Sequence, residues 1–209
     1  MSRLRMLVAA IFAALALCGA TQTSAAVAGW MVNGTEFTGT KALARTAVVT
    51  EFFRFEVPGA VTIACASSTF DAVGAEIKSP NQGAAASIEL HECKPEGKAC
   101  TISNSTIASV PVVAEATLEG ALAAATVISP KTKAVFATVN FEGESCALKG
   151  LAGVTGKARV TYANGQMEET QQRAVLQTTK GEMKVGANEV IGTGAFVRKL
   201  ASGETWSFL

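Results

Sequence analysis

Four cysteines are the residues best suited to chemistry in this 209-residue chain: Cys65, Cys93, Cys100 and Cys146. Thiols can form disulfides, bind zinc or act as nucleophiles, depending on their spacing and compartment. The spacings are not those of C-x₂-C zinc motifs, and the chain has a single histidine, His91, so zinc ligands are lacking. In an oxidising compartment the four thiols would pair, which also removes them as nucleophiles.

The pairing is open, because four cysteines allow three connectivities. Cys93 and Cys100 flank a loop that contains proline and glycine between two strand signals. We therefore favour a loop bond from Cys93 to Cys100 and a long bridge from Cys65 to Cys146. The alternatives are Cys65 with Cys93 and Cys100 with Cys146, or free thiols.

Histidine chemistry would depend on His91 alone. A Ser-His-Asp triad would have to combine it with Asp71, the only aspartate. Strand alternation over Ser87–His91 places His91 on the solvent face, two residues from a cysteine. We interpret it as an exposed strand histidine with no catalytic role.

Paired carboxylates are the other catalytic candidates, Glu142 with Glu144 and Glu168 with Glu169. Glycosidases use two such groups, but acidic residues on a hairpin usually form a solvated sheet edge. Phosphate-loop, dinucleotide and G-x-S-x-G motifs are absent. We predict a non-enzymatic secreted or cell-surface β domain with a binding or structural role, without catalytic residues, cofactor or metal. The alternative is a secreted hydrolase with an unrecognised carboxylate site.

Residues 1–28 have the pattern of a signal peptide. Arg3 and Arg5 precede the apolar run Met6–Leu17, and a small-residue stretch follows. About twelve apolar residues are too few to span a bilayer, so we expect removal and no membrane span afterwards. The candidate cleavage sites follow Ala25, Ala26 and Ala28.

Cys18 offers an alternative, because bacterial lipoprotein signals also end at a cysteine. They usually have Gly, Ala or Ser before it, whereas Leu17 stands here. We expect a secreted or cell-surface protein, with lipid anchoring at Cys18 as the alternative. The remaining residues, 29–209, have the length of a single β domain.

Charge argues against nucleic acid as a partner. The chain has 18 basic and 17 acidic side chains, and removal of Arg3 and Arg5 leaves 16 against 17, a net charge of −1. Basic runs and interleaved aromatic residues, which nucleic-acid binding requires, are missing. The ligand, the partner and the oligomeric state stay open.

Hydrophobic alternation with a period of two predicts strands along most of the chain. The clearest examples are Glu51–Val57, Val61–Cys65, Ser87–His91, Val135–Phe141 and Ala158–Tyr162. Asn164-Gly165 suits a tight turn with positive φ, which predicts a hairpin over 157–177. Two more strands are expected near 189–200 and 204–209.

Helix signals are sparse. Lys41–Ala47 could form a turn or two of helix, whereas Glu115–Ala125 is interrupted by Gly120 and favours strand, turn and strand. The sequence predicts an all-β fold, an antiparallel sandwich or barrel of about ten to twelve short strands with little helix beyond the signal peptide.

Two tryptophans lie near the ends of the expected domain. Trp30 and Trp206 could be exposed aromatic residues that bind sugar or peptide, or core residues on first and last strands that meet. We favour the core, because large aromatic side chains are mostly buried. The sequons at Asn33 and Asn104 are interpreted as turn residues.

A resemblance is carried by the succession VTIAC ending at Cys65, AEIKSP over 75–80, IELHEC ending at Cys93, and VFATV over 135–139 before Cys146. It is similar to a group of uncharacterised secreted proteins from actinobacteria and their relatives, across about 60–160. That group has no assigned activity. The resemblance therefore implies a secreted bacterial β domain and transfers no site residue.

Overall fold

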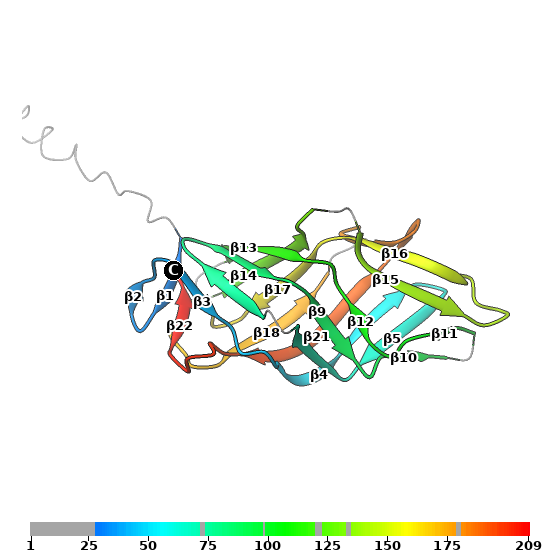
Figure 1. The fold of residues 1–209 in the computed structure, drawn as a ribbon, viewed down its shortest axis with the longest axis horizontal. Helices are drawn as coiled ribbons and strands as arrows, with labels where there is room; N and C mark the ends of the chain where they lie inside the picture. The colour runs from blue at the N-terminus through cyan, green and yellow to red at the C-terminus, as the bar shows by residue number, and fades with distance from the viewer. Residues whose placement is uncertain (1–27, 72–73, 98, 120–122, 133–134, 179–180) are drawn as a thin grey trace, which may run out of the picture.

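The described residues form strands and their connections, with no helix among them (Figure 1). The computed structural model describes residues 28–71, 74–97, 99–119, 123–132, 135–178 and 181–209. The predicted all-β class is confirmed. The signal-peptide prediction and the alternative at Cys18 fall outside the described residues. Within the described part, no helix is long and apolar enough to cross a membrane.

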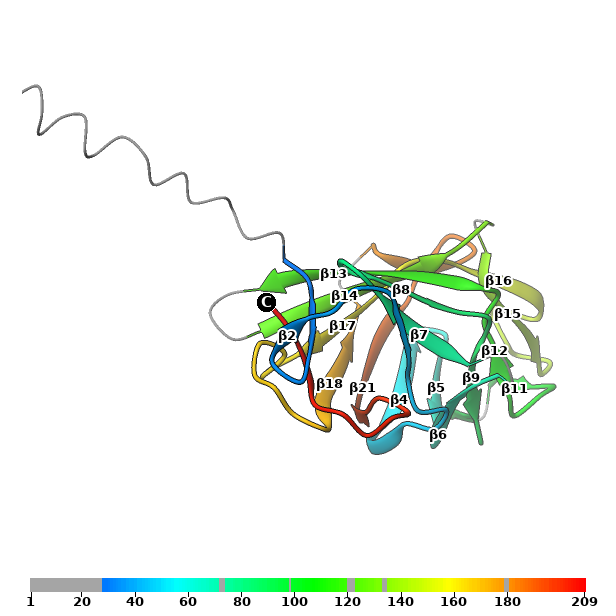
Figure 2. The same ribbon diagram turned by 60° about the vertical axis from the view of Figure 1, so that its left-hand side comes forward.

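The largest sheet is antiparallel and has eleven strands, which curl into a half-barrel (Figure 2). Its strands, in spatial order, are β10 (Lys94–Glu96), β5 (Val61–Cys65), β4 (Val48–Val57), β21 (Ile191–Arg198), β18 (Gln172–Gln177), β17 (Ala158–Tyr162), β14 (Ala123–Pro130), β13 (Val112–Glu119), β8 (Gln82–Ala85), β7 (Ala75–Lys78) and β3 (Thr40–Ala42). All the strand pairs are antiparallel, so side chains alternate between an inner and an outer face.

Three smaller sheets complete the molecule. They are β11 (Thr101–Ile102), β15 (Val135–Glu142), β16 (Gly150–Gly156), β19 (Met183–Val185) and β20 (Asn188–Glu189); then β12 (Ile107–Ala108), β9 (Ile88–His91) and β6 (Ser67–Phe70); and β2 (Thr35–Glu36), β1 (Trp30–Val32) and β22 (Trp206–Phe208). Many of these strands have only two to four residues, so the described strands number 22, more than the ten to twelve expected.

Single bridges connect the small sheets to their neighbours. Thr46 pairs with Thr69 at β6, and Ser109 after β12 pairs with Ala137 of β15. The molecule is elongated, with β1, β2 and β22 at one end and β11 at the other (Figure 1). The inner faces of the sheets enclose the core between these ends.

The inner face of the half-barrel follows the predicted alternation. Phe53 and Val57 of β4 are buried, as are alternate residues of β5 and β17. The neighbouring strand β21 has Gly194 at an inward position, where a Cβ atom would lie 2.7 Å from Cδ1 of Phe53. A larger residue at Gly194 would displace this ring, so glycine allows the two strands to share the interior.

The first and last described strands meet, as favoured for the two tryptophans. β1 pairs with β22, and Trp30 and Trp206 are 3% and 2% exposed, with ring centroids 5.8 Å apart. Their prediction as core residues is confirmed. Asn33 and Gly34 have φ of 51° and 73° and form the two-residue turn between β1 and β2.

The hairpin over 157–177 is right in its strands and wrong in its turn. β17 pairs with β18, but residues 163–171 separate them, and Asn164 does not have the positive φ that the tight turn requires. Gly165 is needed for a different reason: a Cβ atom there would lie 2.8 Å from the Cβ of Ala124. This glycine serves close packing against β14.

The segment 41–47 is extended, so the expected helical turn is wrong. β3 pairs with β7, and Leu43 then bridges Leu200 of the segment after β21. Sheet pairing overrides local helix propensity here. The two strands expected over Glu115–Ala125 are confirmed by β13 and β14, which pair along their length, whereas the expected turn at 120–122 lies outside the described residues.

The disulfides join Cys65 to Cys93 and Cys100 to Cys146, so the favoured pairing was wrong. The reason is that the segment after Cys93 is not a simple hairpin: β10 pairs with β5, whereas β11 pairs with β15 in another sheet. Cys93 therefore lies beside Cys65 of β5, while Cys100 lies beside the sheet that contains β15, with Cα–Cα distances of 3.9 and 4.7 Å across the two bonds. Two intramolecular disulfides are compatible with an extracytoplasmic location.

Candidate functional site

Three cavities lie in the interior, between the half-barrel and the smaller sheets. We call them the Arg198 cavity, of about 70 Å³, the middle cavity, of about 80 Å³, and the far cavity, also of about 80 Å³. The Arg198 cavity is lined by Arg198, Tyr162, Trp206 and Phe70 among others, the middle cavity by Phe53, Leu176 and Ala158, and the far cavity by Val139, Phe141 and Val185.

The cavities are neighbours, because adjacent ones share lining residues. Val160 and Phe196 line both the Arg198 cavity and the middle cavity, while Phe55, Phe136 and Met183 line both the middle and the far cavity. Most of the lining side chains are hydrophobic. The interior thus contains a run of apolar space that starts at the Arg198 cavity. The charged residues of its lining are Arg198 and Glu76, and Glu76 forms an ion pair with Lys78 at 2.7 Å.

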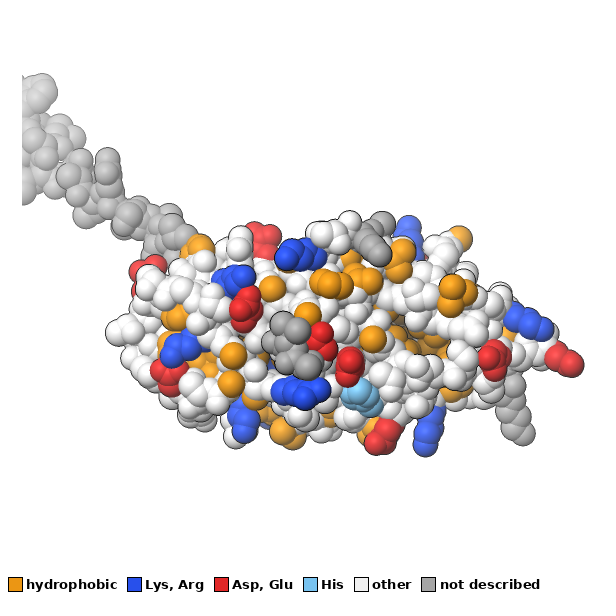
Figure 3. Space-filling view, viewed as in Figure 1, with side chains coloured by type: hydrophobic (Ala, Val, Ile, Leu, Met, Phe, Trp, Pro, Cys, Tyr) orange, Lys and Arg blue, Asp and Glu red, His pale blue; other side chains and the backbone are white. Residues whose placement is uncertain are grey.

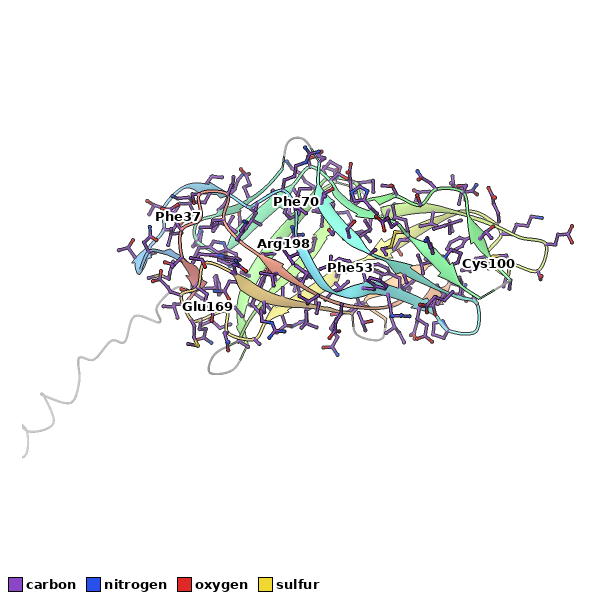
Figure 4. All side chains as sticks on the ribbon, turned by 90° about the horizontal axis from the view of Figure 1, so that it is seen from below. Phe37, Phe53, Phe70, Cys100, Glu169 and Arg198 are labelled. Carbon is purple, nitrogen blue, oxygen red and sulfur yellow. A yellow bond between two sulfur atoms is a disulfide. The ribbon has the colours of Figure 1, made fainter. Side chains whose placement is uncertain are left out.

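Arg198 is the last residue of β21 and points inward, at the position that alternates with Gly194 and Phe196. It is 6% exposed, and its guanidinium carbon lies 4.0 Å from the centroid of the Phe70 ring and 5.1 Å from that of Phe196. Figure 4 shows Arg198 beside Phe70 in the interior. Its Nη1 has no hydrogen-bond partner, and no ion pair of the described residues includes it.

Burial determines the electrostatics of this cavity. It lowers the pKa of Arg198 to about 10, although the neighbouring Tyr162 acts in the opposite direction. Burial also raises the pKa of Tyr162, against the effects of Arg198 and of a hydrogen bond with Thr126. At neutral pH the cavity therefore contains a guanidinium cation and a neutral phenol.

A second donor near this end also lacks a partner. The indole Nε1 of Trp206, which lines the Arg198 cavity, is buried and makes no hydrogen bond. Arginine and tryptophan side chains can only donate hydrogen bonds. What both groups lack is an acceptor, and a buried donor without one is costly.

His91 lies in a different setting, at the molecular surface on β9. Its Nε2 is 2.7 Å from the Thr69 hydroxyl and 3.5 Å from a Glu89 carboxylate oxygen, and its Nδ1 is 3.4 Å from the Thr106 hydroxyl. Figure 3 shows the histidine in pale blue on the surface, near acidic side chains in red. The side chain is half-buried and has partners, which corrects its interpretation as a freely exposed histidine.

The geometry of this cluster differs from that of a catalytic triad. Thr69 and Glu89 approach the same nitrogen of His91, whereas in a triad the nucleophile and the orienting carboxylate occupy opposite nitrogens. Asp71, the aspartate that a triad would need, follows β6 and accepts a hydrogen bond from the backbone N–H of Gly74. The cluster can hold the histidine in place.

The paired glutamates are separate from the interior. Glu142 and Glu144 are exposed near the end of β15. Glu168 accepts a hydrogen bond from the backbone N–H of Gly34, and Glu169 pairs through its backbone with Trp206. None of these four lines one of the three interior cavities. Among the described residues, no group of three or more His, Cys, Asp or Glu could hold a metal ion.

Sequence reasoning missed Arg198, although a signal was present. In the strand that ends at Arg198, the residues of the same parity are Gly192, Gly194 and Phe196, which is an apolar face. An arginine that continues such a face must be buried or must end the strand. No family model, no curated protein and no solved structure matches this chain.

Proposed function

We propose that this chain is a non-enzymatic secreted or cell-surface β domain that binds a small apolar ligand in its interior. The observation that carries the proposal is the run of three neighbouring apolar cavities in the core. Ligand sites are commonly apolar cavities with a few polar groups, and the insides of β barrels often hold them.

The size of the cavities limits the ligand. Each one has room for two or three groups of the size of a water molecule, which occupies roughly 30 Å³. A ligand that extends through all three cavities is therefore narrow. An unbranched alkyl chain fits this space, whereas a fused ring system requires the walls to move.

Partly buried lining residues support access to the interior. Ile88 and Leu90 of β9, Ile107 of β12 and Phe136 of β15 line the cavities and are only partly buried. Figure 3 shows hydrophobic side chains that reach the surface over this region. A ligand would enter between these short strands, because short strands have few hydrogen bonds that hold them in place.

The proposed location combines two observations. The signal-peptide pattern in residues 1–28 supports export, and the two disulfides favour a compartment where thiols oxidise. The resemblance to secreted actinobacterial proteins and the hydrolase alternative stay predictions.

Binding of 1-decanol to the mature domain tests the proposal. A ligand that binds only the folded state raises the thermal midpoint, by an amount equivalent to about 2.7 kcal/mol at a concentration of 100 Kd. We expect the midpoint to rise with the logarithm of the 1-decanol concentration, as binding to a site of the folded state requires.

A matched pair of variants tests whether 1-decanol binds in the far cavity. Ala137, which is 5% exposed, lines the far cavity, and Thr138 follows it on the outer face of β15. Ala137→Leu should weaken decanol binding by filling the cavity, while Thr138→Leu should not. If 1-decanol stabilises neither the wild type nor Thr138→Leu, with both folded by circular dichroism, the proposal fails.

A further inference from the structure

We propose that the ligand of the interior carries an anionic head, a carboxylate or a phosphate monoester on a narrow apolar chain, which Arg198 binds. This proposal rests on the proposed function and specifies its ligand class. It starts from a cation that is placed inside an apolar core without a partner of opposite charge.

The environment of Arg198 explains why an anion is the missing group. A buried charge is costly unless it is paired, and the guanidinium of Arg198 lies against two aromatic rings. The ring faces of Phe70 and Phe196 attract a cation but do not accept the hydrogen bonds that Nη1 can donate. A carboxylate or phosphate accepts two parallel hydrogen bonds from a guanidinium. The unpartnered Nη1 of Arg198 can donate one of them.

Trp206 points to the same conclusion independently. Its unpartnered Nε1 belongs to a residue of the Arg198 cavity, where Tyr162 also lies. An anionic head with several acceptor oxygens can accept hydrogen bonds from all three side chains, because the phenol is protonated at neutral pH. A neutral alcohol has one oxygen and can satisfy fewer of them.

The direction of the chain follows from the order of the cavities. Arg198 lines both the Arg198 cavity and the middle cavity, so a head held there continues into the middle cavity and then past Phe55 and Met183 into the far cavity. Figure 4 shows the same order along the molecule, from Arg198 through Phe53 toward Cys100. The tail would end near Phe141, at the disulfide-linked end.

Calorimetric titration of the mature domain with decanoate, decyl phosphate and 1-decanol tests the head group. We expect one or both anions to bind the wild type about tenfold or more tightly than 1-decanol, because charge-assisted hydrogen bonds strengthen binding by that order. A preference for decanoate over decyl phosphate, or the reverse, identifies the head. Equal affinities for the alcohol and both anions would overturn this inference and leave the proposed function standing.

Two arginine variants locate the effect. The Arg198→Met variant should still bind 1-decanol, and it should bind the anions with about the same affinity as 1-decanol. Arg173 lies on the outer face of neighbouring β18, so Arg173→Met should keep the full preference. A preference that survives in Arg198→Met places the head elsewhere and overturns the inference. Absence of binding by all three probes to the wild type overturns the proposed function itself, so the two failures are distinguishable.

Discussion

Arg198 and His91 show opposite relations between residue type and environment. His91 is a residue that commonly does chemistry, yet it is half-buried at the surface and its two ring nitrogens contact Thr69 and Thr106. Arg198 is an ordinary residue type, yet it is buried beside Phe70 with an unused donor. The comparison shows that the strongest functional signal in this protein is a buried donor without a hydrogen-bond partner, which the sequence alone indicates only weakly.

The two regions also differ in the interactions that stabilise them. The hydrogen bonds of His91 are made by side chains in contact with water, and such bonds contribute little to the free energy of folding. The Arg198 cavity lies in the aromatic end of the core, where Trp206 contacts Trp30 and Tyr162 with centroids 5.8 Å away in each case. Changes at the Arg198 end should therefore have the larger effects.

The largest expected effect is that of Trp206→Ala. Truncating a large aromatic side chain that is 2% exposed should lower the free energy of unfolding by about 3–5 kcal/mol. Phe52→Ala on the outer face of β4, where the side chain is 56% exposed, is the control and should change it by less than about 0.5 kcal/mol. Urea denaturation measures both. Equal effects would mean that the aromatic end is not the core.

The disulfides come next. In the chain-entropy model, loops of 28 and 46 residues give about 3.6 and 4 kcal/mol, so Cys65→Ala/Cys93→Ala and Cys100→Ala/Cys146→Ala should cost nearly the same. Under the favoured pairing, each of these double variants would instead remove one cysteine from both bonds, so each would lose the stabilisation of two disulfides rather than one. Peptide mapping without reduction should find the crosslinks Cys65–Cys93 and Cys100–Cys146.

Arg198→Met should change the free energy of unfolding in the opposite direction. A lone buried cation costs several kcal/mol, and the contacts with two phenylalanine rings return about 2 kcal/mol, so we expect the variant to be more stable by about 1–3 kcal/mol without ligand. Arg173→Met, at an exposed position, should be neutral. Chemical denaturation at pH 7 compares them. A destabilised Arg198→Met would show that the cation is satisfied and would weaken the contrast with His91.

The smallest effect is expected for His91→Ala. Loss of its half-buried hydrogen bonds should lower the free energy of unfolding by no more than about 1 kcal/mol and should leave ligand binding unchanged. The hydrolase alternative makes a different prediction. A hydrolytic activity that this substitution abolishes, with the thermal midpoint preserved, would show that the chain is an enzyme.

The sequence was sufficient for what local alternation determines. Alternating residues around Phe53 and Val160 predicted strands, and the two tryptophans were correctly assigned to the core. The wrong predictions concern residues whose partners lie far along the chain. Cys93 and Cys100 are close in sequence, but β10 and β11 pair with strands that no local pattern specifies.

The candidate site was hidden for a related reason. A strand pattern shows that Arg198 shares a face with Gly194, but it does not show which strands close over that face. The burial of Arg198 depends on Phe70, which lies 128 positions earlier in β6. The three cavities likewise arise where side chains from several sheets fail to fill the interior. Such a feature depends on packing rather than on periodicity.

A crystal structure of the mature domain with decanoate tests the central claim most directly. The account predicts one decanoate per chain, with its carboxylate within hydrogen-bond distance of Nη1 of Arg198 and its chain in the middle and far cavities. The same experiment on Arg198→Met should show the head displaced from this position. Decanoate bound only on the outer surface, with the interior unchanged, would contradict the account.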